Sequence, residues 1–251
     1  MADSEVVAIP EGKKYAIMTA TSMGVRATPT EHRPMHLAGQ MNLQVTSAES
    51  NVVTIPSSLG LPGLVLTKFV EGSPISKLIH SNLRSRGLEV EGPSVPQGGP
   101  WGYRHQFNLV DTGFGARGPR VHNDRAGEVG RTINLKDFDL GRILGDEGVS
   151  VLHISGLIAA LSPEAGTFCL ELAREAHKHG TLVSFDLNYR ASFWEGREKE
   201  LRSMFREIAS ISDVLVGNEE DFQLCLGIEG PEPGGSDVAE KIERFGEMIT
   251  R

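Results

Sequence analysis

A regular alternation of apolar strands and amphipathic helices in the second half of the chain most constrains the fold. Three apolar segments are predicted to form strands, at 149–155, 181–188 and 213–218. One predicted helix begins after Ser162, and a second covers Arg197–Ile211. Strands that alternate with helices form right-handed βαβ units. The pattern therefore predicts an α/β fold with a parallel or mixed sheet flanked by helices.

The first half of the chain is less regular. Its spacing predicts helices over Ser47–Leu59 and Ile75–Arg86 and a strand over Leu64–Phe69, although Pro56 falls inside the first helix. Residues 92–131 are rich in glycine, lack helical periodicity and contain short alternating pieces. These pieces predict a small β flap rather than a second core.

We therefore predict one α/β domain over residues 1–251, with lid segments at approximately 24–45 and 92–131. The last predicted helix runs from Ser236 to Arg251, and no strand follows it, although an alternating chain should continue with one. We expect a fold that is incomplete at its carboxyl terminus. The alternative is a terminal helix that covers a sheet edge.

Composition excludes several classes of protein. Hydrophobic residues make up 39% of the chain and charged residues 23%, a balance typical of globular proteins. The net charge of −8 argues against non-specific nucleic-acid binding, and no apolar run is long enough for a membrane span. No signal peptide is apparent, and the two cysteines, Cys169 and Cys225, have no metal-ligand spacing. We expect a cytoplasmic protein with free thiols.

Polar side chains follow the predicted strands at the points where ligands bind in open parallel sheets. Asp186, Asn188 and Arg190 follow the second strand, and Asn218 and Asp221 follow the third. An arginine fork matches carboxylate or phosphate oxygens, and carboxylates hold Mg²⁺ directly or through water. This edge suits an anionic substrate with a metal nucleotide. The alternative is that Asn218 only caps a helix and that Asp186 and Asn188 only form a turn.

Other polar motifs favour structural roles. His153 alternates within a buried strand, which is typical of a core histidine. His177 and His179 resemble a metal pair but fit the basic end of a helix better. Gly234–Asp237 opens a predicted helix, yet it follows a Pro/Gly loop rather than a strand, which favours a plain cap over a phosphate loop.

Three segments of the second half carry a family resemblance. HISGLIAALSPEAG, SFDLNYRASFW and DVLVGNEEDF resemble the ribokinase-like carbohydrate kinases of the PfkB family, and most of all its 2-keto-3-deoxygluconate kinases. In the first half, SAESNVVTIPSSLGLPGLVLTK is similar to the sugar-binding helix start of that family, and RVHNDRAGE resembles its flap strand. The resemblance runs from about residue 15 to residue 251.

The resemblance implies ATP-dependent phosphoryl transfer to a sugar or sugar-acid hydroxyl, aided by Mg²⁺, in a homodimer joined through the lid. It implies a six-carbon keto-sugar acid as substrate, with a neutral sugar such as fructose as the second choice. In the family pattern Asn218 and Asp221 match a motif that organises metal and phosphate, with aspartate in place of glutamate. The implied substrate-binding residues are Ala48, Asn51, Arg125, Asn188 and Arg190, with Arg190 on the carboxylate.

The chain also departs from the family pattern. Thr46 and Ser47 replace paired glycines, and Glu71-Gly72-Ser73 replaces an acidic turn. The glycine-alanine-glycine-aspartate motif that supplies the anion hole and base is absent, so no catalytic residue is assigned. We expect this polypeptide to show little phosphorylation activity. Two hypotheses remain: an incomplete or divergent sugar-acid kinase, and a catalytically degenerate relative that binds a sugar acid or a partner.

Overall fold

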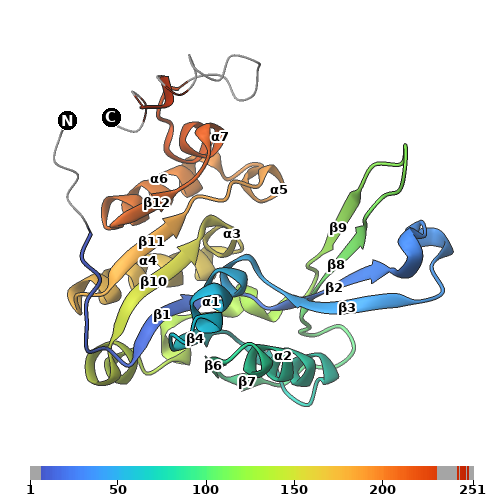
Figure 1. The fold of residues 1–251 in the computed structure, drawn as a ribbon, viewed down its shortest axis with the longest axis horizontal. Helices are drawn as coiled ribbons and strands as arrows, with labels where there is room; N and C mark the ends of the chain where they lie inside the picture. Colours follow the sequence, from blue (N-terminus) through green and yellow to red (C-terminus); the bar gives the residue numbers. More distant parts are fainter. Residues whose placement is uncertain (1–6, 231–241, 243, 247, 249–251) are drawn as a thin grey trace. The chain divides into compact units, whose positions relative to one another are not determined.

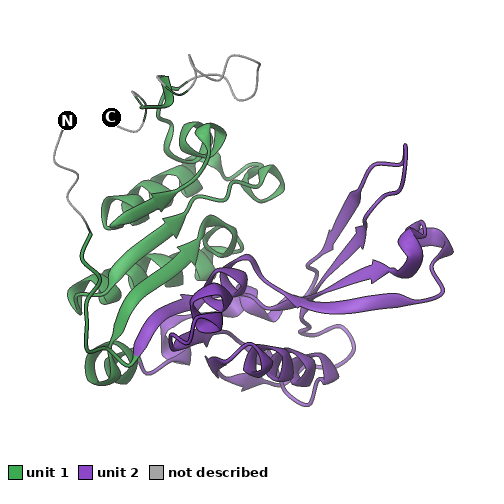
Figure 2. Ribbon diagram, viewed as in Figure 1, with its two compact units in different colours: residues 1–14, 140–251 green, residues 15–139 purple. Residues whose placement is uncertain are grey.

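The computed structural model describes residues 7–230, 242, 244–246 and 248. The chain forms two compact units (Figure 2). Unit 1 comprises residues 1–14 and 140–251, and unit 2 comprises residues 15–139. The greater part of the predicted helix from Ser236 to Arg251 lies outside the described residues.

Unit 1 is built on three parallel strands in the order β12-β11-β10 (Figure 1). Their bounds are β10 (Val149–Ser155), β11 (Leu182–Asp186) and β12 (Val214–Val216). The helices of this unit are α3 (Gly156–Ala159), α4 (Pro163–Lys178), α5 (Ala191–Trp194), α6 (Glu198–Ser210) and α7 (Glu219–Asp221), followed by a π-helical turn (Phe222–Leu226). A second π-helical segment, Gly141–Glu147, precedes β10. The predicted α/β alternation is confirmed.

The caps of unit 1 explain where its longest helix begins and ends. The Ser162 hydroxyl accepts a hydrogen bond from the Ala165 amide at 3.1 Å, and Pro163 occupies the first helical turn. Gly180 adopts a left-handed φ of 70° after the helix. The inner face of α4 is fully buried, including Phe168 and Leu172. Both cysteines are buried free thiols, as predicted.

His153 lies in the core of unit 1, as its alternation predicted. Its side chain is on β10, and its ring nitrogen Nδ1 lies 3.2 Å from the Ser184 hydroxyl. Burial lowers the pKa of His153 to about 4. The imidazole is therefore neutral at physiological pH.

The outer strand of unit 1 is exposed. Val214, Leu215 and Val216 have exposed fractions of 40%, 36% and 46%, although all three are apolar. Among the described residues, no strand pairs with the free side of β12. Its sequence is typical of a buried strand, so the exposure was not expected from the pattern.

Unit 2 contains three parallel strands in the order β1-β4-β6, which are β1 (Tyr15–Ala20), β4 (Gly63–Leu66) and β6 (Leu88–Glu91). Its helices are α1 (Ala48–Ser58) and α2 (Pro74–Ser85). Pro56 is accommodated near the end of α1 without stopping it. Ser73 caps α2, and Gly72 takes a left-handed φ of 69° in the turn before it.

A mixed four-stranded sheet also belongs to unit 2, in the order β3-β2-β8-β9 (Figure 1). Its strands are β2 (Gly24–Pro29), β3 (Met41–Thr46), β8 (Gln106–Asp111) and β9 (Arg120–Asp124). β5 (Phe69–Val70) pairs with β7 (Ser94–Val95) in a separate two-stranded ladder. Short 3₁₀ turns occur at Thr30–His32, Met35–Leu37, Val129–Thr132 and Leu135–Asp137. Most of the mixed sheet falls within the two predicted lid segments.

No described helix is both long enough and apolar enough to cross a membrane.

Candidate functional site

In unit 1, Asp221 links the segments that follow β11 and β12. Its Oδ1 accepts a hydrogen bond from the Tyr189 amide at 2.9 Å, and its Oδ2 accepts one from the Asn218 amide at 2.9 Å. In return, the Asn218 side-chain oxygen accepts a hydrogen bond from the Asp221 amide at 2.9 Å. Asn218 and Asp221 therefore form a capping box at the start of α7, which agrees with the alternative that Asn218 caps a helix. Through its bond to the Tyr189 amide, Asp221 also fixes the backbone beside Arg190.

Asn188 has an unusual conformation at this edge. Its φ of 40° lies in the left-handed region, which costs free energy for any residue other than glycine. The Asp186 carboxylate accepts a hydrogen bond from the Asn188 amide at 3.1 Å and so holds the turn. The Asn188 side-chain oxygen is buried and has no hydrogen-bond partner among the described residues. A buried acceptor without a partner costs free energy, and a hydroxyl or a water molecule that reached it would offset that cost.

Arg190 lies next to this turn with its charge uncompensated. The guanidinium donates to the carbonyl of the adjacent Tyr189 at 2.6 Å, and its side chain is exposed. Within the described part of the chain, Arg190 makes no ion pair. The predicted residues of unit 1, Asn188, Arg190, Asn218 and Asp221, therefore lie together around one strand edge.

A glycine at the end of β10 allows this edge to form. A Cβ atom on Gly156 would lie 2.1 Å from the Leu187 carbonyl oxygen and 2.6 Å from the Phe205 ring. The segment after β11 therefore passes directly against the Gly156 backbone. Any larger residue would displace the turn that carries Asn188 and Arg190.

In unit 2, the predicted flap arginine is paired inside the protein. Arg125 donates to both oxygens of Glu128, at 2.9 and 3.0 Å, and the Ser22 hydroxyl donates to the same carboxylate. The Glu128 side chain is fully buried. Burial raises the pKa of the Glu128 carboxyl, although the neighbouring Arg125 acts in the opposite direction. The charge of Arg125 is thus largely compensated before any ligand binds.

The predicted sugar-binding helix start is also in unit 2. Ser47 has an extended φ of −156°, so its backbone does not require glycine, and its hydroxyl accepts a hydrogen bond from the Ser50 amide at 2.9 Å. Ala48 begins α1, and Asn51 is exposed one turn later. The side chain of Asn51 contacts Arg86 and lines a pocket that does not include Arg125. The roles of Ala48, Asn51 and Arg125 in substrate binding remain predictions.

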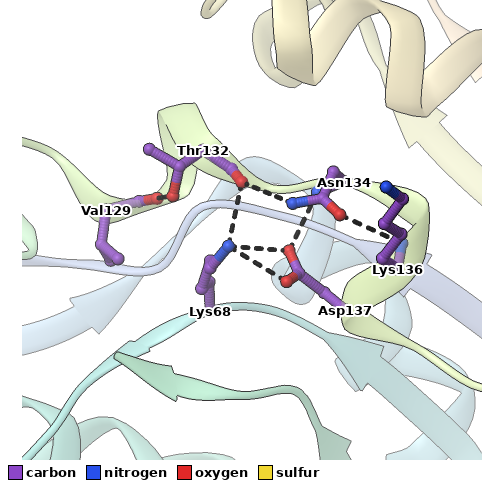
Figure 3. Close-up of polar contacts among 6 residues, drawn as sticks. All are labelled: Lys68, Val129, Thr132, Asn134, Lys136 and Asp137. Carbon is purple, nitrogen blue, oxygen red and sulfur yellow. Dashed lines mark hydrogen bonds and ion pairs between the residues drawn. The ribbon is translucent and has the colours of Figure 1, made fainter. Parts of the chain in front are cut away.

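A buried ion pair follows β4 in unit 2 (Figure 3). Lys68 donates to the Thr132 carbonyl at 3.0 Å and to the Asp137 carboxylate at 2.9 Å. The side chains of Lys68 and Asp137 are only 8% and 12% exposed. Asp137 also accepts from the Asn134 amide at 2.9 Å. The pair fastens the segment after β9 to the end of β4, and sequence reasoning missed it because 69 residues separate the partners.

The residues present fit an indirect role in magnesium binding. Both Asp221 oxygens already accept backbone hydrogen bonds, which leaves only their remaining lone pairs for a hydrated ion. In the described residues, no group of three or more histidine, cysteine, aspartate or glutamate side chains could hold a metal. His177 and His179 thus form no metal cluster there, and they lie at the end of α4.

Comparison with known proteins shows similarity to carbohydrate kinases. Residues 147–251 match the model of the pfkB family carbohydrate kinases. The 5-dehydro-2-deoxygluconokinase of Clostridium perfringens is 22% identical over 95% of this chain and 68% of its own. The crystal structure of 2-dehydro-3-deoxygluconokinase from Thermotoga maritima matches with a TM-score of 0.81 and 25% identity, over 94% of this chain and 68% of that one.

A third match is an uncharacterized sugar kinase from Pyrococcus horikoshii, solved in complex with ATP. It has a TM-score of 0.69 and 15% identity and covers 84% of this chain and 66% of that one. The structural similarities define an α/β protein of ribokinase-like fold, as predicted. The match of residues 147–251 to the pfkB family of carbohydrate kinases confirms the predicted resemblance to that family. The matching relatives are phosphotransferases that act on carbohydrates.

Proposed function

We propose that this protein is an ATP-dependent kinase of a six-carbon keto-sugar acid, of the 2-keto-3-deoxygluconate type. The observation that carries the proposal is the strand edge of unit 1. There an exposed, unpaired Arg190 lies beside Asn188, whose buried oxygen has no partner among the described residues. An arginine fork matches a carboxylate, and the orphaned amide oxygen matches a sugar hydroxyl. No catalytic base is assigned.

The relatives support the acid rather than a neutral sugar. The kinases from Clostridium perfringens and Thermotoga maritima are both named for dehydro-deoxygluconates, and a gluconate carries a carboxylate that fructose lacks. In this chain, Arg190 would hold the carboxylate, and Asn188 would bind a hydroxyl. Ala48, Asn51 and Arg125 are proposed as further substrate contacts. Fructose is the second candidate substrate.

ATP would donate the phosphoryl group, with Mg²⁺ bound mainly by its phosphates. Asn218 and Asp221 would organise that end of the site without ligating the metal, since their polar atoms already bond to the backbone and to each other. Mg²⁺ supplies neutralisation of the charge on the transferred phosphoryl group. This assignment agrees with the acidic and amide side chains that follow β12.

We propose that the protein is a cytoplasmic homodimer joined through the mixed sheet of unit 2. Met41, Leu43 and Val121 lie on strands of this sheet and are 40%, 52% and 61% exposed. Exposed apolar side chains on a small sheet favour burial against a partner. Sedimentation of the purified chain at micromolar concentration should give a dimer, and a clean monomer would contradict the proposal.

The substrate is tested by binding and turnover in parallel. The purified chain is mixed with 2-keto-3-deoxygluconate or fructose, and its melting temperature is measured before ATP and Mg²⁺ are added for a coupled ADP-release assay. We expect stabilisation by the keto acid and none by fructose. Stabilisation by fructose alone would overturn the acid assignment. Because the glycine-alanine-glycine-aspartate motif is absent from this polypeptide, we expect little ADP release even when the acid binds. Clear ADP release would favour the kinase over the catalytically degenerate relative.

A further inference from the structure

Unit 2 contains a polar pocket of about 370 Å³ beside the edge strand β3. It is lined by residues of β2, β3, α1 and α2, which include Arg26, Gln44, Asn51 and Asn82, and by Arg86 at the end of α2. A pocket of this size accommodates a small molecule. None of the residues that line it is acidic, and two are arginines.

Arg86 lines the pocket, and its guanidinium donates hydrogen bonds to neutral acceptors. The guanidinium donates to the Val45 carbonyl at 2.9 Å and to the Asn51 side-chain oxygen at 3.4 Å. Its side chain is half-buried, and burial lowers the pKa of the guanidinium, which nevertheless stays charged at neutral pH. A desolvated charge without a counter-ion is costly to the protein. An anion in the pocket would relieve that cost.

Arg26 is the second cation of the pocket. It lies on β2 directly across from Gln44 on β3. Other arginines of this unit are paired with acids, since Arg104, Arg117 and Arg125 each contact a carboxylate. Neither Arg26 nor Arg86 has such a partner among the residues that the structure describes. The pocket therefore gathers two uncompensated positive charges.

Asn82 adds a feature that points to the kind of ligand. It lies on α2, four residues before the capping residue Arg86, a spacing that brings both side chains to the same side of the helix end. Its side-chain oxygen is buried and has no hydrogen-bond partner among the described residues. An unmet acceptor requires a donor, and a carboxylate or phosphate does not provide one. A hydroxyl group does.

We infer that this pocket binds a small hydroxylated anion, with Arg26 and Arg86 on the acid group and Asn82 on a hydroxyl. The acid group is a carboxylate or a phosphate ester, and the experiment distinguishes the two. The inference does not rest on the proposed kinase activity, because binding is measured without ATP. The pocket includes Asn51, one of the proposed substrate contacts, but neither Arg190 nor Arg125.

Isothermal titration calorimetry of the whole chain with gluconate, glucose 6-phosphate and glucose tests the inference. We expect saturable binding of one of the two anions and none of glucose. Arg26→Gln and Arg86→Gln should each weaken that binding about tenfold or more, since a hydrogen bond to a charged group is worth roughly 1.5–3 kcal/mol. Arg86→Lys should recover part of the loss. Arg120→Gln is the matched control, because Arg120 is an exposed arginine of the same unit outside the pocket, and it should bind as the parent does.

Two further variants distinguish binding at this pocket from binding elsewhere on the protein. Asn82→Leu should weaken binding of the hydroxylated anion and leave binding of inorganic phosphate unchanged. Arg190→Gln should have no effect, and loss of binding in that variant alone would overturn the inference in favour of the strand edge of unit 1. The inference also fails if neither anion binds, or if Arg86→Gln lowers the melting temperature without weakening the affinity of the anion.

Discussion

The two units of this protein differ in whether the cationic side chains that follow their strands are paired with acids. In unit 2, Lys68 and Arg125 are buried against Asp137 and Glu128. In unit 1, the Asp221 carboxylate bonds to backbone amides, and Arg190 is left exposed without a counter-ion among the described residues. At these strand ends, Lys68 and Arg125 of unit 2 hold loops in place, whereas Arg190 of unit 1 remains available to a ligand.

This contrast distinguishes Arg125 from Arg190, two residues for which the sequence predicts the same role. Arg125 and Arg190 were both predicted to bind a sugar acid, and both follow family motifs. The Arg125 side chain is 16% exposed and paired, so an incoming carboxylate must compete with Glu128. Arg190 faces no such competition. We therefore expect Arg190 to contribute the larger share of acid binding.

The largest expected effect comes from breaking the buried pair of unit 2. Lys68→Met leaves the Asp137 carboxylate buried without its cation, which should reduce the free energy of unfolding by about 3–5 kcal/mol. Urea denaturation measures the change. The matched control is Lys14→Met, because Lys14 forms a more exposed pair with Glu147 that should contribute less than about 1 kcal/mol. Equal losses in the two variants would mean that burial does not distinguish the pairs.

The comparison of the two arginines is the next test. Arg190→Gln should weaken binding of 2-keto-3-deoxygluconate about 10- to 100-fold, because a charge-assisted contact is lost. Arg125→Gln should weaken it by less than about threefold, since that charge is already compensated. Titration calorimetry without ATP measures both affinities. The reverse order would show that the flap arginine is the principal acid contact.

The free energy of unfolding at acidic pH should depend on protonation of His153, the buried histidine of unit 1. The folded pKa of His153, about 4, lies below its ordinary value of 6.5, so between these values the unfolded chain binds more protons. Stability is therefore lost as the pH falls through this window, by about 2 kcal/mol at pH 5. His153→Gln should remove this part of the slope in urea titrations at several pH values. His122→Gln, at an exposed histidine of unit 2, should keep it.

The smallest expected effect concerns the partner of Arg125. Glu128→Gln removes the negative charge and frees the guanidinium, which should tighten binding of 2-keto-3-deoxygluconate about threefold to tenfold. The control is Glu31→Gln, since Glu31 forms an exposed pair with Arg33. Unchanged affinity in Glu128→Gln would indicate that Arg125 does not contact the substrate.

The fold of unit 1 was predictable because its signals are local. The cap at Ser162, the apolar face of α4 and the alternation in β10 each depend on residues close in sequence, and the structure confirms all three. In unit 2 the helices were also predicted, but the mixed sheet was recognised only as a flap. Its strands pair over separations such as Gly24 with Gln106, which no local pattern reveals.

The candidate site was predicted in part. The polar residues after β11 and β12 were expected to meet, because parallel strands end at one edge, and Tyr189 and Asp221 do meet there. The partners of buried charges were not expected. Glu128 follows Arg125 by three residues, a spacing that could have indicated the pair, whereas Lys68 and Asp137 are joined only by the tertiary fold.

The exposed strand β12 has a consequence for handling the protein. Val214, Leu215 and Val216 present apolar side chains and backbone hydrogen-bonding groups on an edge that is unpaired among the described residues. An edge of this kind is a template for another extended chain. Association beyond the proposed dimer, which rises with protein concentration, should therefore begin at this edge. Leu215→Lys should suppress it, because a charged side chain on an edge strand opposes strand addition.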